Sequence, residues 1–399
     1  MILDFNDVLL LVKEKKFNEA LKNLDQLIKI DNQNFKYYHL KGTIHFNFDE
    51  FSDAIKSFSS ALTINKNDPN IYYLRGASYV KQTNYEEAKK DFNKAISLKE
   101  NFSEAFFGLG VMYFENNESL LAIENFLKSI EFKSDFKQPI FQLIKTLTYV
   151  DSTEEFNSIF ISKNHEINKI NIKYSLNEYI DDNEIKNFLS NIDKIIDNNF
   201  ENLAFRETQI YRRNQKNLNC KRHKKVFNTY GVIPKFCFGC YKVQLDPDNL
   251  IDLIKLYIVF DKIELKNNNL RKCMIELRPN IKGRYKGLIY CNSIEEALVI
   301  QKQIAHVLEK NLNKNITCKI KKGCTEFGIK HDKYDSLEND ALKYNEDWND
   351  FEKLIDKKFP HFNSITKSKQ TINGVTLNDA LIIKNWLTYA QNNNDDSML

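Results

Sequence analysis

Residues 69–102 read PNIYYLRGASYVKQTNYEEAKKDFNKAISLKENF, and the pattern in this stretch decides the fold of the N-terminal third of the chain. Its glycine, Gly76, recurs 34 residues away in both directions, at Gly42 and Gly110. The same 34-residue period carries an alanine and, four residues later, a bulky apolar residue: Ala20, Ala54, Ala88 and Ala122, then Leu24, Phe58, Phe92 and Phe126. A period kept this strictly predicts one helical hairpin stacked four times, with these places as the close contacts between helices.

The pattern resembles the tetratricopeptide repeat, in which small residues stand where two helices cross and bulky ones where neighbouring units meet. Residues 35–68 carry it as Tyr38, Gly42, Ala54, Phe58 and Ala61, residues 69–102 as Tyr72, Gly76, Tyr79, Ala88, Phe92 and Ala95, and the next unit as Phe106, Gly110, Tyr113, Ala122 and Phe126. In the first unit Val8 stands at the glycine place, which we attribute to a terminal unit with one unstacked face. The resemblance therefore implies four repeat units over residues 1–136, the first of them partial.

The resemblance also implies a binding groove, because in this family the first helix of each unit lines a concave surface. Its second, fifth, ninth and twelfth places hold Lys36, His39, Thr43 and Phe46; Asn70, Tyr73, Ala77 and Val80; and Glu104, Phe107, Val111 and Phe114. An aromatic and apolar groove predicts a protein or peptide partner with bulky side chains. The alternative is that some of these rings pack between adjacent helices.

Charge divides the rest of the chain. Residues 205–334 contain about 27 Lys and Arg against about 12 Asp and Glu, although the whole chain has a net charge of only +4. We therefore expect a helical cap or linker over 137–204, a basic module over 205–334, and an acidic helical tail with a disordered end over 335–399. The basic module would either bind a polyanion such as RNA or another phosphate-bearing ligand, or dock on the acidic remainder of the same protein.

The basic module has the pattern of a small α+β fold. Alternating apolar residues predict strands over 240–245, 271–278, 285–291 and 316–321, and helical periodicity predicts helices over 249–263 and 293–312. This order, strand, helix, strand, strand, helix, strand, is that of a ferredoxin-like split β-α-β sandwich with both helices on one face. The predicted fold class is thus an α-solenoid of helical hairpins, followed by a ferredoxin-like α+β module and C-terminal helices.

The face of the predicted sheet that points away from the helices is basic. Residues 286–290 and 293–297 resemble the third strand and second helix of RNA-recognition motifs, although Leu288 stands where that family prefers an aromatic ring. Alternation assigns seven residues of this face as candidates for polyanion binding: Lys242, Lys272, Arg278, Lys286, Tyr290, Lys319 and Lys321. Leu277, by contrast, is expected to point at the helices.

The seven cysteines all lie between residues 220 and 324. Cys220 and His223 form a C-x2-H pair and Cys237 and Cys240 a C-x2-C pair, a spacing that can close a tetrahedral zinc site. The predicted strand order would also bring Cys324 close to the second pair. We therefore expect zinc at Cys237 and Cys240, completed by two of Cys220, His223 and Cys324. Buried free thiols and an iron–sulfur cluster are the alternatives.

These features favour a protein-binding adaptor whose second module holds another ligand. The alternative is an enzyme of unspecified reaction, in which the basic Cys/His module is catalytic and the repeats recruit the substrate. The sequence contains no Gly-rich phosphate loop, no nucleophile elbow and no His-Glu-x-x-His, so no reaction is specified. Acidic residues near the start and the absence of a long apolar stretch predict a cytoplasmic protein with no membrane partner.

Overall fold

The computed structural model describes residues 4–151, 153, 155–170, 176, 178–196, 200, 203–215, 218–278, 281, 283–312, 316–338, 340–363, 369–395 and 397. Two compact units divide the chain. The first comprises Met1–Leu143 with Leu354–Thr366, and the second comprises Ile144–Lys353 with Lys367–Leu399. The sequence predicted one tail over 335–399, whereas the structure divides these residues between the two units. Of the end expected to be disordered, residues 396, 398 and 399 lie outside the described residues.

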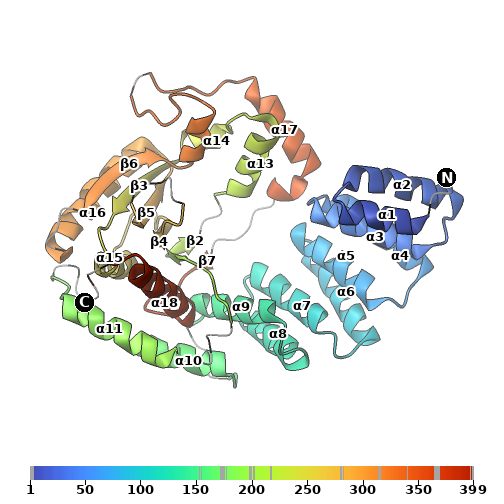
Figure 1. Ribbon diagram of the computed structural model, residues 1–399, viewed down its shortest axis with the longest axis horizontal. Helices are drawn as coiled ribbons and strands as arrows, with labels where there is room; N and C mark the ends of the chain where they lie inside the picture. Colours follow the sequence, from blue (N-terminus) through green and yellow to red (C-terminus); the bar gives the residue numbers. More distant parts are fainter. Residues whose placement is uncertain are drawn as a thin grey trace. The chain divides into compact units, whose positions relative to one another are not determined.

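The first unit is built from helical hairpins (Figure 1). In chain order its helices are α1 (Phe5–Lys13), α2 (Phe17–Ile30), α3 (Phe35–Asn47), α4 (Phe51–Ile64), α5 (Pro69–Lys81), α6 (Tyr85–Leu98), α7 (Ser103–Glu115) and α8 (Ser119–Phe132). Each helix contacts the next, so the hairpins stack in chain order. The second helices of the hairpins begin 34 residues apart, which confirms the predicted solenoid. Helix α9 (Lys137–Thr146) begins where a fifth unit would begin.

The turn inside each hairpin repeats with the same period, although no glycine marks it. Lys15, Asp49, Thr83 and Asn117 adopt left-handed backbone conformations, with φ of 61°, 62°, 60° and 65°. One residue further on, each turn is closed by a backbone hydrogen bond, such as Glu50 N to His45 O at 2.9 Å. Because non-glycine residues rarely adopt this conformation, sequence patterns do not predict this type of turn at these places.

The glycine period has a steric cause. A Cβ atom on Gly42 would lie 2.7 Å from the ring of Phe58, on Gly76 2.9 Å from the ring of Phe92, and on Gly110 2.4 Å from the ring of Phe126. These rings are fully buried, with exposed fractions of 0%. Each glycine therefore makes room for the phenylalanine sixteen residues later, which crosses from the second helix of the same hairpin.

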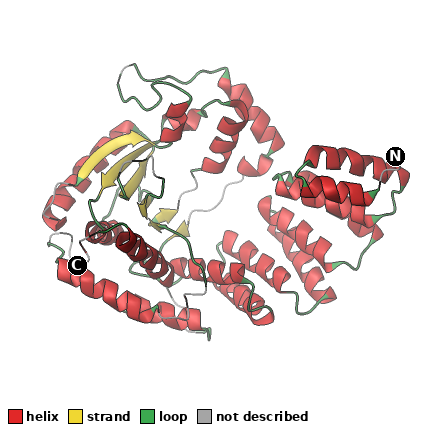
Figure 2. Ribbon diagram, viewed as in Figure 1, coloured by secondary structure: helices red, strands yellow, loops and turns green. Residues whose placement is uncertain are grey.

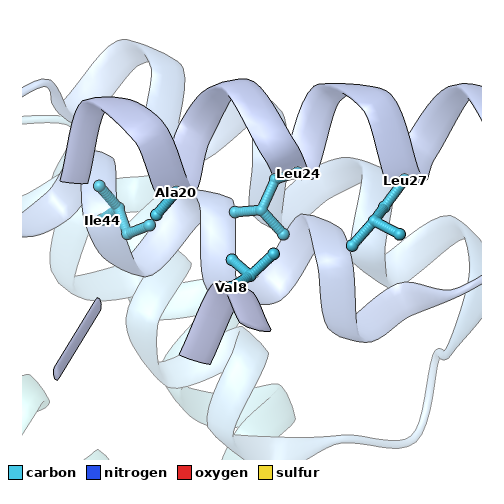
Figure 3. Close-up of a cluster of buried hydrophobic side chains, with 5 residues drawn as sticks. All are labelled: Val8, Ala20, Leu24, Leu27 and Ile44. Atoms are coloured by element: carbon cyan, nitrogen blue, oxygen red, sulfur yellow. The ribbon is translucent and has the colours of Figure 1, made fainter. Parts of the chain in front are cut away.

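The first hairpin solves the same packing problem with different side chains (Figure 3). Its twenty-fourth place is Leu24, which is smaller than phenylalanine, and its eighth place is Val8 in place of glycine. Both are fully buried in one cluster with Ala20, Leu27 and Ile44. Val8 is therefore accommodated in the hairpin, because the larger residue at one place compensates for the smaller residue at the other.

The second unit contains a five-stranded antiparallel sheet (Figure 2). Its strands are β1 (Gln209–Arg212), β3 (Tyr241–Asp246), β4 (Arg271–Ile275), β5 (Tyr285–Cys291) and β6 (Thr317–Lys322), in the order β1-β4-β5-β3-β6. The last four strands are those predicted, and their order is that of the ferredoxin-like fold. Strand β1 adds a fifth member beside β4, which the sequence patterns did not predict. A short ladder pairs β2 (Asn214–Gln215) with β7 (Lys369–Gln370).

Two helices contact the sheet as predicted. Helix α15 (Leu250–Lys262) contacts β4 and β5, and α16 (Ile294–Leu312) contacts β3, β5 and β6. The residues of α15 are buried from Leu250 to Asp261, because α11 (Asp182–Ile195) and α18 (Leu377–Asn392) contact it as well. Leu277 is 60% exposed, so its predicted place toward the helices is wrong: β4 ends at Ile275, and the alternation does not extend to Leu277.

Helix α18 forms part of the core of the second unit. Trp386 is fully buried and donates a hydrogen bond from Nε1 to the carbonyl of Thr208 at 2.9 Å. Arg212, on β1, is 1% exposed and pairs with Asp379 on α18 at 2.6 Å and with Asp261 on α15 at 3.1 Å. A buried ion network thus joins β1, α15 and α18. Helix α10 (Ile159–Asn168) contacts α11 and α18. Cys220 is the first residue of α13 (Cys220–Tyr230), and Cys237 lies in α14 (Lys235–Phe238). Helix α17 (Trp348–Lys358) follows them in the chain.

Among the described residues, none of the helices is both long enough and apolar enough to span a membrane.

Candidate functional site

The predicted groove residues lie on α3, α5 and α7, the first helices of the second, third and fourth hairpins. Lys36 and Asn70 are exposed, whereas Val80 and Phe114 are buried at 7% and 6% exposure. The remaining eight are partly exposed: His39, Thr43, Phe46, Tyr73, Ala77, Glu104, Phe107 and Val111. Most of these side chains are therefore accessible to solvent, whereas Val80 and Phe114 belong to the core.

The fifth place of each unit carries a ring that packs on the buried phenylalanine of the same hairpin. The centroid distances are 6.1 Å for His39 and Phe58, 6.1 Å for Tyr73 and Phe92, and 6.0 Å for Phe107 and Phe126. Burial lowers the pKa of His39 and raises the pKa of Tyr73, so both rings favour their neutral forms. The rings pack between helices and also remain partly exposed. Lining a groove and packing between helices are therefore compatible roles for these residues.

A later segment of the chain contacts the second repeat within the same unit. Lys358 Nζ lies 3.0 Å from Glu50 Oε1, and the ring of His361 lies 4.7 Å from the ring of Phe51, at an interplanar angle of 68°. Glu50 and Phe51 stand at the turn from α3 into α4. This contact reaches one end of the predicted groove, because Phe51 also packs edge-on against Phe46 at 5.4 Å.

Of the cysteine pair of the second unit, Cys237 lies in α14 and Cys240 directly precedes β3. Tyr334 donates a hydrogen bond from its hydroxyl to Cys237 O at 3.0 Å, and Gly323 donates one from its amide to Cys240 O at 2.9 Å. A Cβ atom on Gly323 would lie 2.4 Å from Cys240 Sγ, so the end of β6 packs directly on this sulfur. The strand order thus places the segment that leads to Cys324 against the cysteine turn.

Cys220 is the first residue of α13 and is exposed, and His223 follows it by three residues in the same helix. His223 is 4% exposed and stacks on Phe236 at a centroid distance of 5.0 Å. Hydrogen bonds with Cys324 and then His223 lower the pKa of Cys220 to about 5. Burial raises the pKa of Cys240 to about 11 and raises that of Cys237 as well. The thiols therefore differ, with Cys220 favouring the thiolate.

The structure gathers Cys220, His223, Cys237, Cys240 and Cys324 into one region, since Cys324 interacts electrostatically with Cys220 and Cys237. In the part of the chain that the structure describes, however, no group of three or more His, Cys, Asp or Glu side chains is arranged to hold a metal ion. Cys273 and Cys291 are buried elsewhere in the sheet. The sequence spacing found these residues, but spacing cannot give the distances between their ligand atoms.

The sheet face opposite the helices is largely covered, in contrast to the open basic surface that alternation suggested. Gln244, Met274, Lys286 and Leu288 are each 5–8% exposed. Lys286 and Arg278 share the carboxylate of Glu276, at 3.3 Å and 2.8 Å, and Lys319 pairs with Asp246 at 2.6 Å. The hydrogen bonds from Arg278 lower the pKa of Glu276 to about 2. Lys321 and Tyr290 are partly exposed on the same face.

Two lysines of this face have uncharged hydrogen-bond partners. Lys242 Nζ donates to Gly323 O and Lys272 Nζ donates to Gln209 Oε1, each at 3.1 Å. The Lys272 ammonium also lies 5.7 Å from the ring of Tyr211 and 6.0 Å from the ring of Tyr290. Burial lowers the pKa of Lys272 to about 8, and repulsion from Lys242 and Arg278 adds to the shift. In the described part of the chain, neither Lys242 nor Lys272 forms an ion pair with a carboxylate, unlike Lys286 and Lys319.

Other basic residues of the second unit pair with its acidic segments. Arg222 Nη1 lies 2.8 Å from Glu352, Lys235 lies 3.0 Å from Glu346, and Arg212 is enclosed by Asp379 and Asp261. These contacts correspond to the alternative in which the basic module docks on acidic parts of the same protein. The sequence could not show most of these pairs, because residues such as Arg222 and Glu352 lie 130 positions apart.

Comparison with known proteins adds to this description. A tetratricopeptide-repeat model matches residues 69–102, and a TPR-repeat model matches residues 49–83. No curated protein matches the chain. Among solved structures, the crystal structure of MamA is 21% identical with a TM-score of 0.34, covering 37% of this chain and 84% of MamA. A tetratricopeptide repeat protein from Parabacteroides merdae is 18% identical with a TM-score of 0.34, covering 35% and 55%.

A third solved structure is the first TPR of Spaghetti (RPAP3), bound to an HSP90 peptide. It is 19% identical with a TM-score of 0.28, covering 29% of this chain and 92% of that one. The 34-residue period, the packing of glycine on phenylalanine in three hairpins and the two family matches over residues 49–102 agree with one another. Residues 49–102 therefore contain tetratricopeptide repeats, and the helices from α1 to α8 follow the same 34-residue period.

Proposed function

We propose that this protein is an adaptor that holds a partner peptide in the groove lined by α3, α5 and α7. The observation that carries the proposal is the repeated ring at the fifth place of each unit. His39, Tyr73 and Phe107 stay partly exposed although each packs on a buried phenylalanine. A peptide with bulky apolar side chains is the ligand that such a surface fits best.

The packing behind these rings favours binding. A ring held by a buried neighbour loses little conformational freedom when a partner covers it, so less of the binding energy is lost to ordering. Thr43, Ala77 and Val111, one helical turn after the rings, are small and partly exposed. Lys36, Asn70 and Glu104, at the second places, add polar groups at the margin of this surface, where they would select among partner sequences.

The Ala77→Arg variant tests the groove, because it inserts a long charged side chain at a partly exposed place and removes no existing packing. Peptides selected from a displayed library on the full chain should bind this variant at least about tenfold more weakly. Ser97→Arg, at an exposed place on α6, makes a comparable change on a second helix and should bind them normally. The dissociation constants are measured by calorimetry. Equal affinity for both variants would rule out the groove as the site.

We further propose that the basic module binds a phosphate-bearing ligand beside Lys242 and Lys272. Two partly buried ammonium groups with uncharged hydrogen-bond partners are costly to keep charged, and a bound anion would stabilise them. Because Gln244, Met274 and Leu288 are covered, a small phosphate group fits this face better than an extended RNA strand does. The candidates Arg278, Lys286 and Lys319 already have carboxylate partners.

Zinc remains our proposal for the cysteines. Cys237 and Cys240, with two of Cys220, His223 and Cys324, supply soft ligands of the type that zinc prefers. The electrostatic interactions among these residues support the proposal. Binding would have to bring the chosen sulfur and nitrogen atoms to about 2.0–2.3 Å from one point.

The enzyme alternative is favoured by one observation, the exposed Cys220 at a helix N-terminus beside His223, which is the environment of a reactive thiolate.

One set of measurements on the purified full chain separates these proposals. Elemental analysis should find one zinc per chain, and the Cys237→Ser variant should lose it. Zinc-bound Cys220 should react slowly with iodoacetamide until a chelator is added, whereas fast alkylation of a metal-free chain would favour the enzyme.

Inorganic phosphate should bind the Lys272→Met variant at least about tenfold more weakly than the parent chain. Lys302→Met, an exposed change on α16, is the control. Unchanged phosphate binding by Lys272→Met would remove Lys272 from the site.

A further inference from the structure

The segment that follows residue 353 contacts the repeats through a small set of side chains. The ion pair between Lys358 and Glu50 and the ring contact between His361 and Phe51 are both present. The two residues that lie between them, Phe359 and Pro360, include a phenylalanine that is 3% exposed. The four residues Lys-Phe-Pro-His thus place a cation and an aromatic ring on neighbouring residues of one repeat.

The receiving residues are positioned in advance. Glu50 Oε2 lies 2.8 Å from His45 Nδ1, so the carboxylate is held from the α3 side while its other oxygen meets Lys358. Burial disfavours the charged form of Glu50, but the hydrogen bonds with His45 and Lys358 outweigh it and the pKa of Glu50 is lowered. Phe51 is 4% exposed and lies edge-on to Phe46, a groove residue, at 5.4 Å.

An acid followed by an aromatic residue occurs at this turn in the second repeat alone. The corresponding pairs in the other units are Lys16 and Phe17, Asn84 and Tyr85, and Glu118 and Ser119. The first pair has the opposite charge, the second lacks a charge, and the third lacks a ring. The repeat period therefore offers four equivalent turns, and the later segment contacts the one whose chemistry matches a lysine followed by a ring.

We propose that residues 358–361 are a built-in occupant of the second repeat, and that the partner of this repeat is a peptide in which a basic residue is followed by an aromatic ring or histidine. The proposal rests on the groove function proposed above and names the chemistry of one part of the ligand. The partner would displace the chain's own segment from Glu50 and Phe51. Binding by the groove and release of residues 358–361 are then the same event.

The contact of residues 358–361 with the second repeat is weak enough for a partner peptide to replace it. The side chain of Lys358 is 60% exposed, and an exposed ion pair changes an equilibrium constant by no more than about fivefold. Attachment to the same chain gives the segment a millimolar effective concentration, so even a weak contact is occupied most of the time. A free partner peptide with additional contacts along the groove can nevertheless replace it.

A labelled peptide with the sequence of residues 354–363, LIDKKFPHFN, tests the proposal by fluorescence anisotropy on the full chain. The Lys358→Glu chain should bind this peptide up to about fivefold more tightly than the parent, because its own segment competes less well. Lys357→Glu makes the same charge change at the neighbouring exposed residue and should leave the affinity unchanged.

The receiving side is tested by Glu50→Lys. This chain should bind the parent peptide weakly and should prefer a peptide with glutamate at the place of Lys358, since reversing both charges restores the pair. Equal affinity of the peptide for the parent and Lys358→Glu chains, or binding that Glu50→Lys does not change, would overturn the proposal. Ala77→Arg distinguishes the two proposals: it should block peptides selected for the groove but leave the residue 354–363 peptide bound at Glu50. If library peptides do not depend on Ala77, the groove function fails, whereas a residue 354–363 peptide that does not depend on Glu50 overturns this inference alone, so the two failures are distinguishable.

Discussion

Replacing Arg212 by methionine is expected to lower the free energy of unfolding of the second unit by about 3–5 kcal/mol. Arg212 is 1% exposed and is paired with Asp379, which is fully buried. It also lies 3.1 Å from Asp261 and donates a hydrogen bond to Gly374 O at 3.0 Å. Without the guanidinium, two carboxylates are left buried with no cation between them, and breaking a buried pair in this way is costly.

Two further variants make this prediction specific. Arg206→Met removes an arginine from an exposed place just before β1 and should change stability by no more than about 0.5 kcal/mol. Adding Asp379→Leu to Arg212→Met removes one of the two abandoned charges and should recover part of the loss. Urea denaturation followed by tryptophan fluorescence reports on this unit, because Trp386 lies in α18 beside the network. A loss below about 1 kcal/mol would show that the network is not the link between β1 and α18.

Phe126→Ala is expected to destabilise the first unit by about 3–5 kcal/mol, because a fully buried ring would be replaced by a cavity between α7 and α8. Gly110→Ala should also be destabilising, by about 1–3 kcal/mol, although alanine favours helices over glycine. Its Cβ would lie 2.4 Å from the Phe126 ring, which is fully buried. The measurement is thermal unfolding by circular dichroism at the helix band.

The two changes should not add. In a chain with Phe126→Leu the clash at residue 110 is relieved, so Gly110→Ala should cost less there than in the parent, and the difference measures the contact directly. Phe132→Ala, in the last turn of the same helix, removes a ring that is 45% exposed and should cost much less than Phe126→Ala. If Phe132→Ala and Phe126→Ala cost the same, the repeated contact between glycine and phenylalanine is not what stabilises the hairpins.

Much of the fold could be predicted because its determinants are local or periodic. The places of Gly42, Gly76 and Gly110 are set by contacts within single hairpins, so a 34-residue period carries them. The order of strands β3 to β6 follows from the succession of strands and helices. Strand β1 and the role of α18 could not be predicted in this way. Arg212 and Asp379 pair across 167 positions, and within its own segment Arg212 looks like one more basic surface residue.

The candidate site residues also divide into those that sequence patterns identified and those whose contacts depend on the tertiary fold. Spacing identified the cysteines and histidine at 220, 223, 237 and 240, and the strand order placed Cys324 near them. Alternation correctly assigned Lys242 and Lys272 to one face but could not show that other segments cover that face, because coverage depends on tertiary contacts. The contact of Lys358 and His361 with the second repeat had no signal in the sequence, since it joins residues about three hundred positions apart.

The central claim is that the first helices of the repeats hold a polypeptide, and hydrogen exchange of the full chain tests it most directly. With a saturating library-selected peptide, amides of α3, α5 and α7 should gain protection, while those of α4, α6 and α8 should change little. Release of residues 358–361 would appear in the same experiment as faster exchange of that segment. Protection confined to the second helices, or to the second unit, would contradict the account.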